Sequence, residues 1–75
     1  MDIDMHNAIA DKLEASKSAG WLTEYLVAWH GSGGHLSPNV VVWRTLDRDD
    51  NLVKAYVSGL LSELVPASDI EIASN

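Results

Sequence analysis

The residues with the clearest capacity for chemistry lie in one glycine-rich run, His30-Gly31-Ser32-Gly33-Gly34-His35. A phosphate-binding loop of this kind would continue into Lys and Ser or Thr at the start of a helix. A serine nucleophile on a hydrolase elbow would need Gly at the position of His30. Neither pattern is present, so we interpret residues 31–38 as a loop between two strands.

The histidines are the first candidate metal ligands. His6, His30 and His35 are scattered along a chain without Cys, whereas zinc sites use compact sets of Cys, His and carboxylate. We therefore expect no metal and no cofactor at these positions.

Residues 47–51, Asp-Arg-Asp-Asp-Asn, space their oxygen atoms like the opening of a calcium loop. Such a loop requires Gly where this chain has Leu52 and a bidentate Glu where it has Ser58. A capped helix start explains the same residues. A chain of 75 residues also has little room for both a core and a catalytic cleft, so we expect no enzyme.

The charge balance is the strongest signal in the composition. Eleven Asp and Glu oppose five Lys and Arg, which gives a net charge of −6 and a pI near 4.6. Nucleic acids and anionic membranes attract basic surfaces, so we expect neither as a direct partner. A basic surface on another protein is the partner that this charge favours, although many proteins are acidic for solubility alone.

Two groups of carboxylates are the candidate binding residues: Asp47, Asp49 and Asp50 on the polar turn, and Glu63, Asp69 and Glu71 near the C-terminus. If residues 69–72 form a strand, Asp69 and Glu71 point to the same side, about 7 Å apart. Carboxylates at that spacing can imitate the phosphates of a nucleic-acid strand. The alternative is a solvated acidic surface without a partner.

Apolar spacing predicts five elements. Residues 4–18 repeat apolar side chains as in a helix, and residues 50–64 carry a full core-facing stripe. Residues 40–46 are β-branched and predict a strand. Residues 21–30 fit either a strand or a helix, and we favour a strand that forms a hairpin with residues 40–46. Residues 69–72 alternate acidic and apolar side chains and predict a short final strand.

The resulting order is helix, strand, strand, helix and short strand. We expect one α+β domain over residues 1–75, with helices on one face of a small antiparallel sheet. If residues 21–30 were helical instead, the chain would be mostly α. No apolar run reaches the length of a membrane span, and the N-terminus is acidic, unlike a signal peptide; both features favour a cytoplasmic protein.

Three Trp and two Tyr, with no Phe, make up the aromatic set. Trp21, Trp29 and Trp43 either build the core or lie at an interface, where such residues are enriched. A domain of this size has a marginal core, so burial of these side chains against a second chain would stabilise it.

Together these features predict a small acidic protein-binding module. Its concrete form is an inhibitor that occupies the basic, nucleic-acid-binding surface of another protein, as phage-encoded decoys of the anti-CRISPR type do. The alternative is a structural or homodimeric subunit of a larger complex, without activity of its own.

Overall fold

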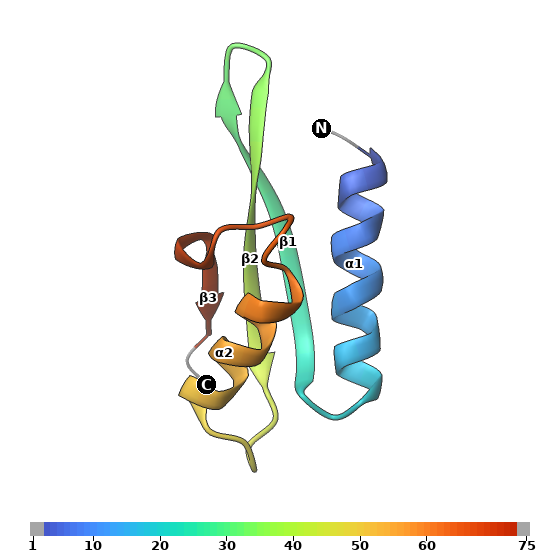
Figure 1. The fold of residues 1–75 in the computed structure, drawn as a ribbon, viewed down its shortest axis with the longest axis vertical. Coiled ribbons are helices and arrows are strands. Elements are labelled where there is room, and N and C mark those ends of the chain that lie inside the picture. The colour runs from blue at the N-terminus through green and yellow to red at the C-terminus, as the bar shows by residue number, and fades with distance from the viewer. Residues whose placement is uncertain (1–2, 74–75) are drawn as a thin grey trace.

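The fold consists of two helices and three strands, which the computed structural model describes over residues 3–73 (Figure 1). In chain order the elements are α1 (Ile3–Ser18), β1 (Leu22–Ser32), β2 (His35–Arg44), α2 (Asp50–Leu60), the 3-10 helix η1 (Ala67–Asp69) and β3 (Ile70–Ile72). The α+β expectation is confirmed, and the mostly helical alternative is wrong because β1 occupies the ambiguous segment. No helix within the described residues is long and apolar enough to cross a membrane.

β1 and β2 form an antiparallel hairpin that is longer than the sequence indicated. The loop expected over residues 31–38 is wrong, because only Gly33 and Gly34 form the turn, between Ser32 and His35. Both glycines have positive φ, +65° and +85°. A two-residue type I′ turn requires this combination, which other residues rarely adopt. The adjacent glycines therefore close the hairpin tightly, and its tip extends past both helices (Figure 1).

β3 joins β2 in parallel, so the sheet is mixed, with the strand order β1-β2-β3. Val40 pairs with Ile70, and Val42 pairs with Ile72. The sequence predicted an antiparallel sheet throughout. α2 accounts for the difference, because a helix between two strands returns the chain to the end of the sheet where the first strand began.

Both helices pack on the same face of the sheet, around one core. Its buried members are Ile9, Leu13, Leu22, Val40, Val42, Val53, Val57, Leu61, Val65 and Ile70. Within each helix these residues recur at every fourth position, which keeps them on one side of the helix. Val40 and Val42 of the central strand are both 0% exposed, so β2 contributes the middle of this core.

α2 ends at Leu60, before the predicted end at residue 64. Gly59 lies in its last turn and has a low helix propensity, which explains the early end. Beyond it, the amides of Leu64 and Val65 both donate to the carbonyl of Leu61 at 2.8 Å. This tight turn keeps Leu61 and Val65 in the core. The predicted apolar stripe is therefore right, and the predicted helix length is wrong.

Arg48 joins three segments where β2 leads into α2. Its Nε donates to the carbonyl of Gly20 at 3.0 Å, and its guanidinium lies over Trp21, 4.0 Å from the ring centroid. Trp21 also stacks on Tyr56 of α2, with centroids 4.0 Å apart and ring planes inclined by 2°. The entry to β1, the turn after β2 and the helix α2 are thus fastened together by one stack.

We expect the Arg48→Ala substitution to lower the free energy of unfolding by about 1–2 kcal/mol, because it removes a cation–π contact and a charged hydrogen bond. Urea denaturation followed by tryptophan fluorescence measures this change. The Arg48→Lys variant is the control: it keeps the charge without the planar stack, so it should recover only part of the loss. Equal stability of all three proteins would contradict this role of Arg48.

Candidate protein-binding face

The two helices leave the other face of the sheet uncovered. Side chains alternate along a strand, so Val41 points away from the core that contains Val40 and Val42. The register places Leu26 opposite Val41, and opposite residues of an antiparallel pair share a face. The same rule gives the members of this surface, which we call the open face: Glu24, Leu26, Ala28, Asn39, Val41, Trp43 and Glu71.

Apolar side chains form the centre of the open face. Leu26 is 53% exposed, and Ala28, Val41 and Trp43 are half-buried. The hydroxyl of Thr23 donates to the carbonyl of Trp43 at 3.2 Å, which fastens the backbone beside the indole ring. Contiguous apolar surface on a small protein is typical of a site that binds another protein.

Two carboxylates flank this apolar centre, one on each outer strand. Glu24 of β1 accepts a hydrogen bond from the Tyr25 amide at 3.0 Å and pairs with Lys17 at 3.7 Å. Glu71 of β3 is exposed and pairs in register with Val41. The ion pair of Glu24 is itself exposed and contributes little to stability. The open face thus combines an apolar centre with an acidic rim, in which Glu71 is exposed on β3 and Glu24 lies at the edge of β1 beside Lys17.

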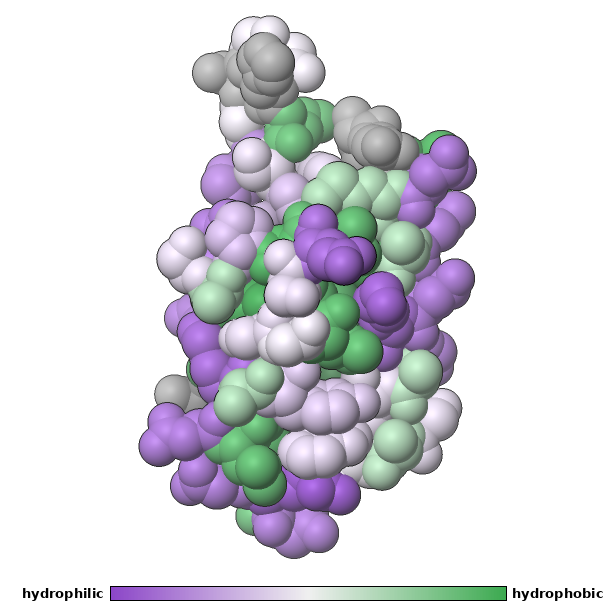
Figure 2. Space-filling model, in the orientation of Figure 1, coloured by the Kyte–Doolittle hydropathy of each residue, from purple (hydrophilic) through white to green (hydrophobic). Residues whose placement is uncertain are grey.

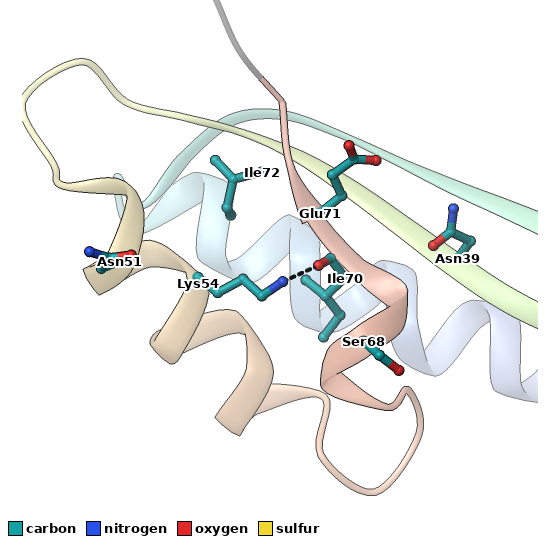
Figure 3. A pocket seen from close by; sticks show the side chains of 7 residues that line it. All are labelled: Asn39, Asn51, Lys54, Ser68, Ile70, Glu71 and Ile72. Atoms are coloured by element: carbon teal, nitrogen blue, oxygen red, sulfur yellow. Dashed lines mark hydrogen bonds between the residues drawn. The ribbon is translucent and has the colours of Figure 1, made fainter.

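A shallow groove of about 710 Å³ continues from the open face around β3 to α2 (Figure 3). Glu71 and Asn39 extend on one side of β3, whereas Ile70 and Ile72 extend on the side of α2. Lys54 reaches from α2 and donates to the carbonyl of Ile70. The groove is lined by Asn39, Asn51, Lys54, Ser68, Ile70, Glu71 and Ile72. These residues offer hydrogen-bonding groups, and none of them is a histidine that could activate a hydroxyl.

A second groove, of about 410 Å³, lies between α1 and the end of α2. Figure 2 shows apolar surface in the middle of the face on which α2 lies, bordered by polar side chains. The residues that line the groove are Ala8, Lys12, Gly59, Leu60, Ser62, Glu63 and Leu64. Glu63 therefore lies on the helical side of the molecule, away from the open face.

Most basic side chains are bound to oxygen atoms of the protein itself. Arg44 donates through Nη1 to three carbonyls of the turn that follows β2. Arg48 donates to the carbonyl of Gly20, and Lys54 donates to that of Ile70. These hydrogen bonds hold the backbone in place, and the surface of the protein is acidic because eleven Asp and Glu outnumber five Lys and Arg.

The carboxylates predicted on the polar turn have roles in the fold. Asp49 caps α2, because its carboxylate accepts hydrogen bonds from two amides of the first helical turn. Asp50 pairs with Arg44, and Asp47 is exposed. The cap that the sequence favoured over a calcium loop is confirmed, and two of these carboxylates have partners within the chain.

The carboxylates near the C-terminus do not form the predicted row. Asp69 belongs to η1, so the expectation that Asp69 and Glu71 share a strand is wrong. The amide of Asp69 donates to the carbonyl of Pro66 at 2.9 Å, which closes the 3-10 turn and delays the strand to Ile70. Of the predicted carboxylates, only Glu71 belongs to the open face.

The three tryptophans occupy three different environments. Trp43 belongs to the open face, and Trp21 lies in the stack with Arg48. Trp29 points to the core side, where its Nε1 donates to Nδ1 of His6 at 3.0 Å. Of these predicted interface aromatics, the fold therefore places Trp43 alone on the uncovered face.

The side chains that the structure describes bring no group of three or more metal-ligating residues together. His6 is engaged by Trp29, and His30 is exposed on the hairpin. The side chain of His35 lies outside the described part of the chain.

Leu26 and Val41, the apolar centre of the open face, were not among the binding residues predicted from the sequence. The alternation of side chains along a strand could have indicated Leu26. If Tyr25 and Val27 point to the core, Leu26 between them must point to the opposite face. The pairing of Leu26 with Val41 depends on the position of the turn, which the predicted loop obscured.

Tyr25 and Glu14 connect β1 to α1. The Tyr25 hydroxyl donates to the Glu14 carboxylate at 2.7 Å. This hydrogen bond, then burial and the negative charge of nearby carboxylates, raise the pKa of Tyr25 above its ordinary 10.0. The bond therefore contributes its full stability below the pKa of the unfolded state, and this contribution is lost as the pH rises through the folded pKa.

We expect the Glu14→Gln substitution to lower the pKa of Tyr25, because a neutral amide accepts a weaker hydrogen bond and carries no charge. Absorbance of ionised tyrosine in an alkaline titration measures the pKa, and the Tyr25→Phe protein identifies the signal. The Glu63→Gln protein is the control, because Glu63 lies in the groove between α1 and the end of α2; its tyrosine titration should match that of the wild type. An unchanged midpoint in the Glu14→Gln protein would show that the hydrogen bond is not formed.

Comparisons of this chain with protein-family models, with curated proteins and with solved structures give no match. What the chain does has therefore to be inferred from its own residues.

Proposed function

We propose that this chain is a protein-binding module that docks through its open face onto a partner with an apolar centre and a basic rim. One observation carries the proposal: an apolar sheet face, uncovered by either helix, is flanked by Glu24 and Glu71. Burial of Leu26, Val41 and Trp43 against a partner would favour association by about 25 cal/mol per Å² of apolar area.

The charge of the whole chain supports a basic partner. A net charge of −6 attracts a basic surface, speeds association and disfavours acidic competitors. The three cations that bind backbone carbonyls, Arg44, Arg48 and Lys54, are included in this net charge and leave it negative.

The concrete form of this proposal is an inhibitor that occupies a nucleic-acid-binding surface, as phage-encoded decoys do. Surfaces that bind nucleic acids are basic, which makes them suitable partners for an acidic rim. The separation of Asp69 from Glu71 does not weaken this form, because competition requires only that the chain and the nucleic acid overlap on the partner. Imitation of the phosphate spacing is not needed.

The Leu26→Glu substitution tests the open face. We expect it to reduce partner capture about ten-fold, because it introduces a charge into an apolar contact. The Leu46→Glu substitution is the matched control, since it makes the same change at a side chain that is 80% exposed in the turn after β2. Tagged wild-type and variant chains are incubated with a bacterial lysate, and the captured proteins are quantified by mass spectrometry.

A protein that is captured by the wild type and by Leu46→Glu, but not by Leu26→Glu, would support docking through the open face. Equal capture by all three chains would contradict it. Circular dichroism of each variant establishes that the fold is intact.

The inhibitory form makes a separate prediction. We expect the chain to displace a labelled oligonucleotide from the purified partner, and to do so less well as the salt concentration rises. Fluorescence anisotropy of the oligonucleotide measures the displacement. Binding of the chain and the oligonucleotide to the partner at the same time would rule out this form and leave only the binding module.

A further inference from the structure

β1 is an edge strand, and the pairing pattern shows which of its backbone groups point outward. Pro38 lacks an amide proton and lies opposite Trp29, so this pair belongs to the class without hydrogen bonds. The classes alternate along an antiparallel ladder. Val27 and Gly31 therefore belong to the same class as Trp29, and their amides and carbonyls point away from β2.

The other side of the sheet confirms this pattern. The amide of Ala73 donates to the carbonyl of Val42 at 2.8 Å, so the backbone groups of Val42 face β3. Tyr25, which lies opposite Val42, must then direct its amide outward. It does, because this amide donates to the carboxylate of Glu24.

The two edges of the sheet differ in their protection. β3 has three residues, and Lys54 covers the carbonyl of Ile70. Short strands and edge lysines are common protection against pairing with another chain. β1 has 11 residues. No described residue forms a hydrogen bond with the outward groups of Val27, Trp29 or Gly31.

We propose that this exposed edge of β1 pairs with the same edge of a second copy of the chain, antiparallel about a two-fold axis at Trp29. The two Trp29 residues then exchange backbone hydrogen bonds, and Val27 of each copy pairs with Gly31 of the other. The two sheets join into one sheet with the strand order β3-β2-β1-β1-β2-β3.

The lack of charged side chains along this edge favours a second copy as the occupant. Residues 26–32, Leu-Val-Ala-Trp-His-Gly-Ser, contain no Asp, Glu, Lys or Arg, in a chain whose net charge is −6. Two copies would repel one another through other surfaces, but no like charges meet along this segment. A strand from a basic partner would gain no carboxylate contact from it.

Two further features favour this arrangement. The tip of the hairpin extends past both helices (Figure 1), and a two-stranded ribbon alone is marginally stable in water. In the proposed dimer, the β1 strand of the second copy lies beside this hairpin and adds a third strand to it. Ile3 is 58% exposed on the turn of α1 that carries His6, which contacts Trp29, so it lies near the proposed axis. There it could pack against its equivalent in the other copy.

Amide hydrogen exchange of the wild-type chain, measured from about 5 μM to about 1 mM, tests the pairing directly. We expect the amides of Val27, Trp29 and Gly31 to exchange fast in the dilute protein and at least ten-fold more slowly when it is concentrated. The amides of Ala28 and His30 bond to β2 and should be protected at every concentration. A dimer in which Val27, Trp29 and Gly31 still exchange fast, or a chain that is monomeric throughout by sedimentation, would overturn the proposal.

Two substitutions of Val27 distinguish the effect of its outward amide from the effect of its side-chain contacts. Val27→Pro removes the outward amide, whereas Val27→Ala keeps it and loses similar side-chain contacts. We expect Val27→Ala to dimerise and Val27→Pro to remain a folded monomer by sedimentation and circular dichroism. A dimer of Val27→Pro would contradict the pairing.

Leu26→Glu alters the open face and leaves this backbone edge intact, so it should dimerise. Failure of this proposal and failure of the proposed function are therefore distinguishable.

Discussion

The two helices can cover only one face of the three-stranded sheet, and the rest of the structure depends on this constraint. A chain of 75 residues buries a smaller share of its surface than a larger domain does, so it has material for a single core. That core lies between the helices and Val40 and Val42 of the central strand. Since side chains alternate along β2, burying these two valines forces Val41 and its neighbours onto an uncovered face. The candidate binding surface is thus a direct consequence of how the core is built.

The small core is reinforced by cations that bind backbone carbonyls. Arg48 joins the carbonyl of Gly20 to the ring of Trp21, Arg44 closes the turn after β2, and Lys54 holds the start of β3. Hydrogen bonds from charged donors are stronger than those from neutral ones, so a few such residues can stabilise the connections between elements. The acidic exterior has a separate origin, the excess of eleven Asp and Glu over five Lys and Arg.

Local patterns in the sequence predicted the elements well and their connections poorly. The repeat of Val53 and Val57 identifies a helix, and the β-branched residues of β2 identify a strand, because both signals arise from neighbouring positions. The Gly33-Gly34 turn was hidden, since Ser32 and His35 have the composition of a loop although they pair in the sheet. Contacts between distant residues leave no local signal, and Arg48 is 28 residues from the glycine that it binds.

The open face was only partly predictable for the same reason. Trp43 and Glu71 were identified by residue type, whereas Leu26 and Val41 become neighbours only when the hairpin register is known. Solvent relaxation of methyl groups by a soluble paramagnetic agent, measured by NMR on the isolated chain, tests the open face most directly. We expect strong relaxation of the Leu26 and Val41 methyl groups and weak relaxation of those of Val40 and Val42. Protection of Leu26 and Val41 would contradict it, because another part of the chain would then cover the face.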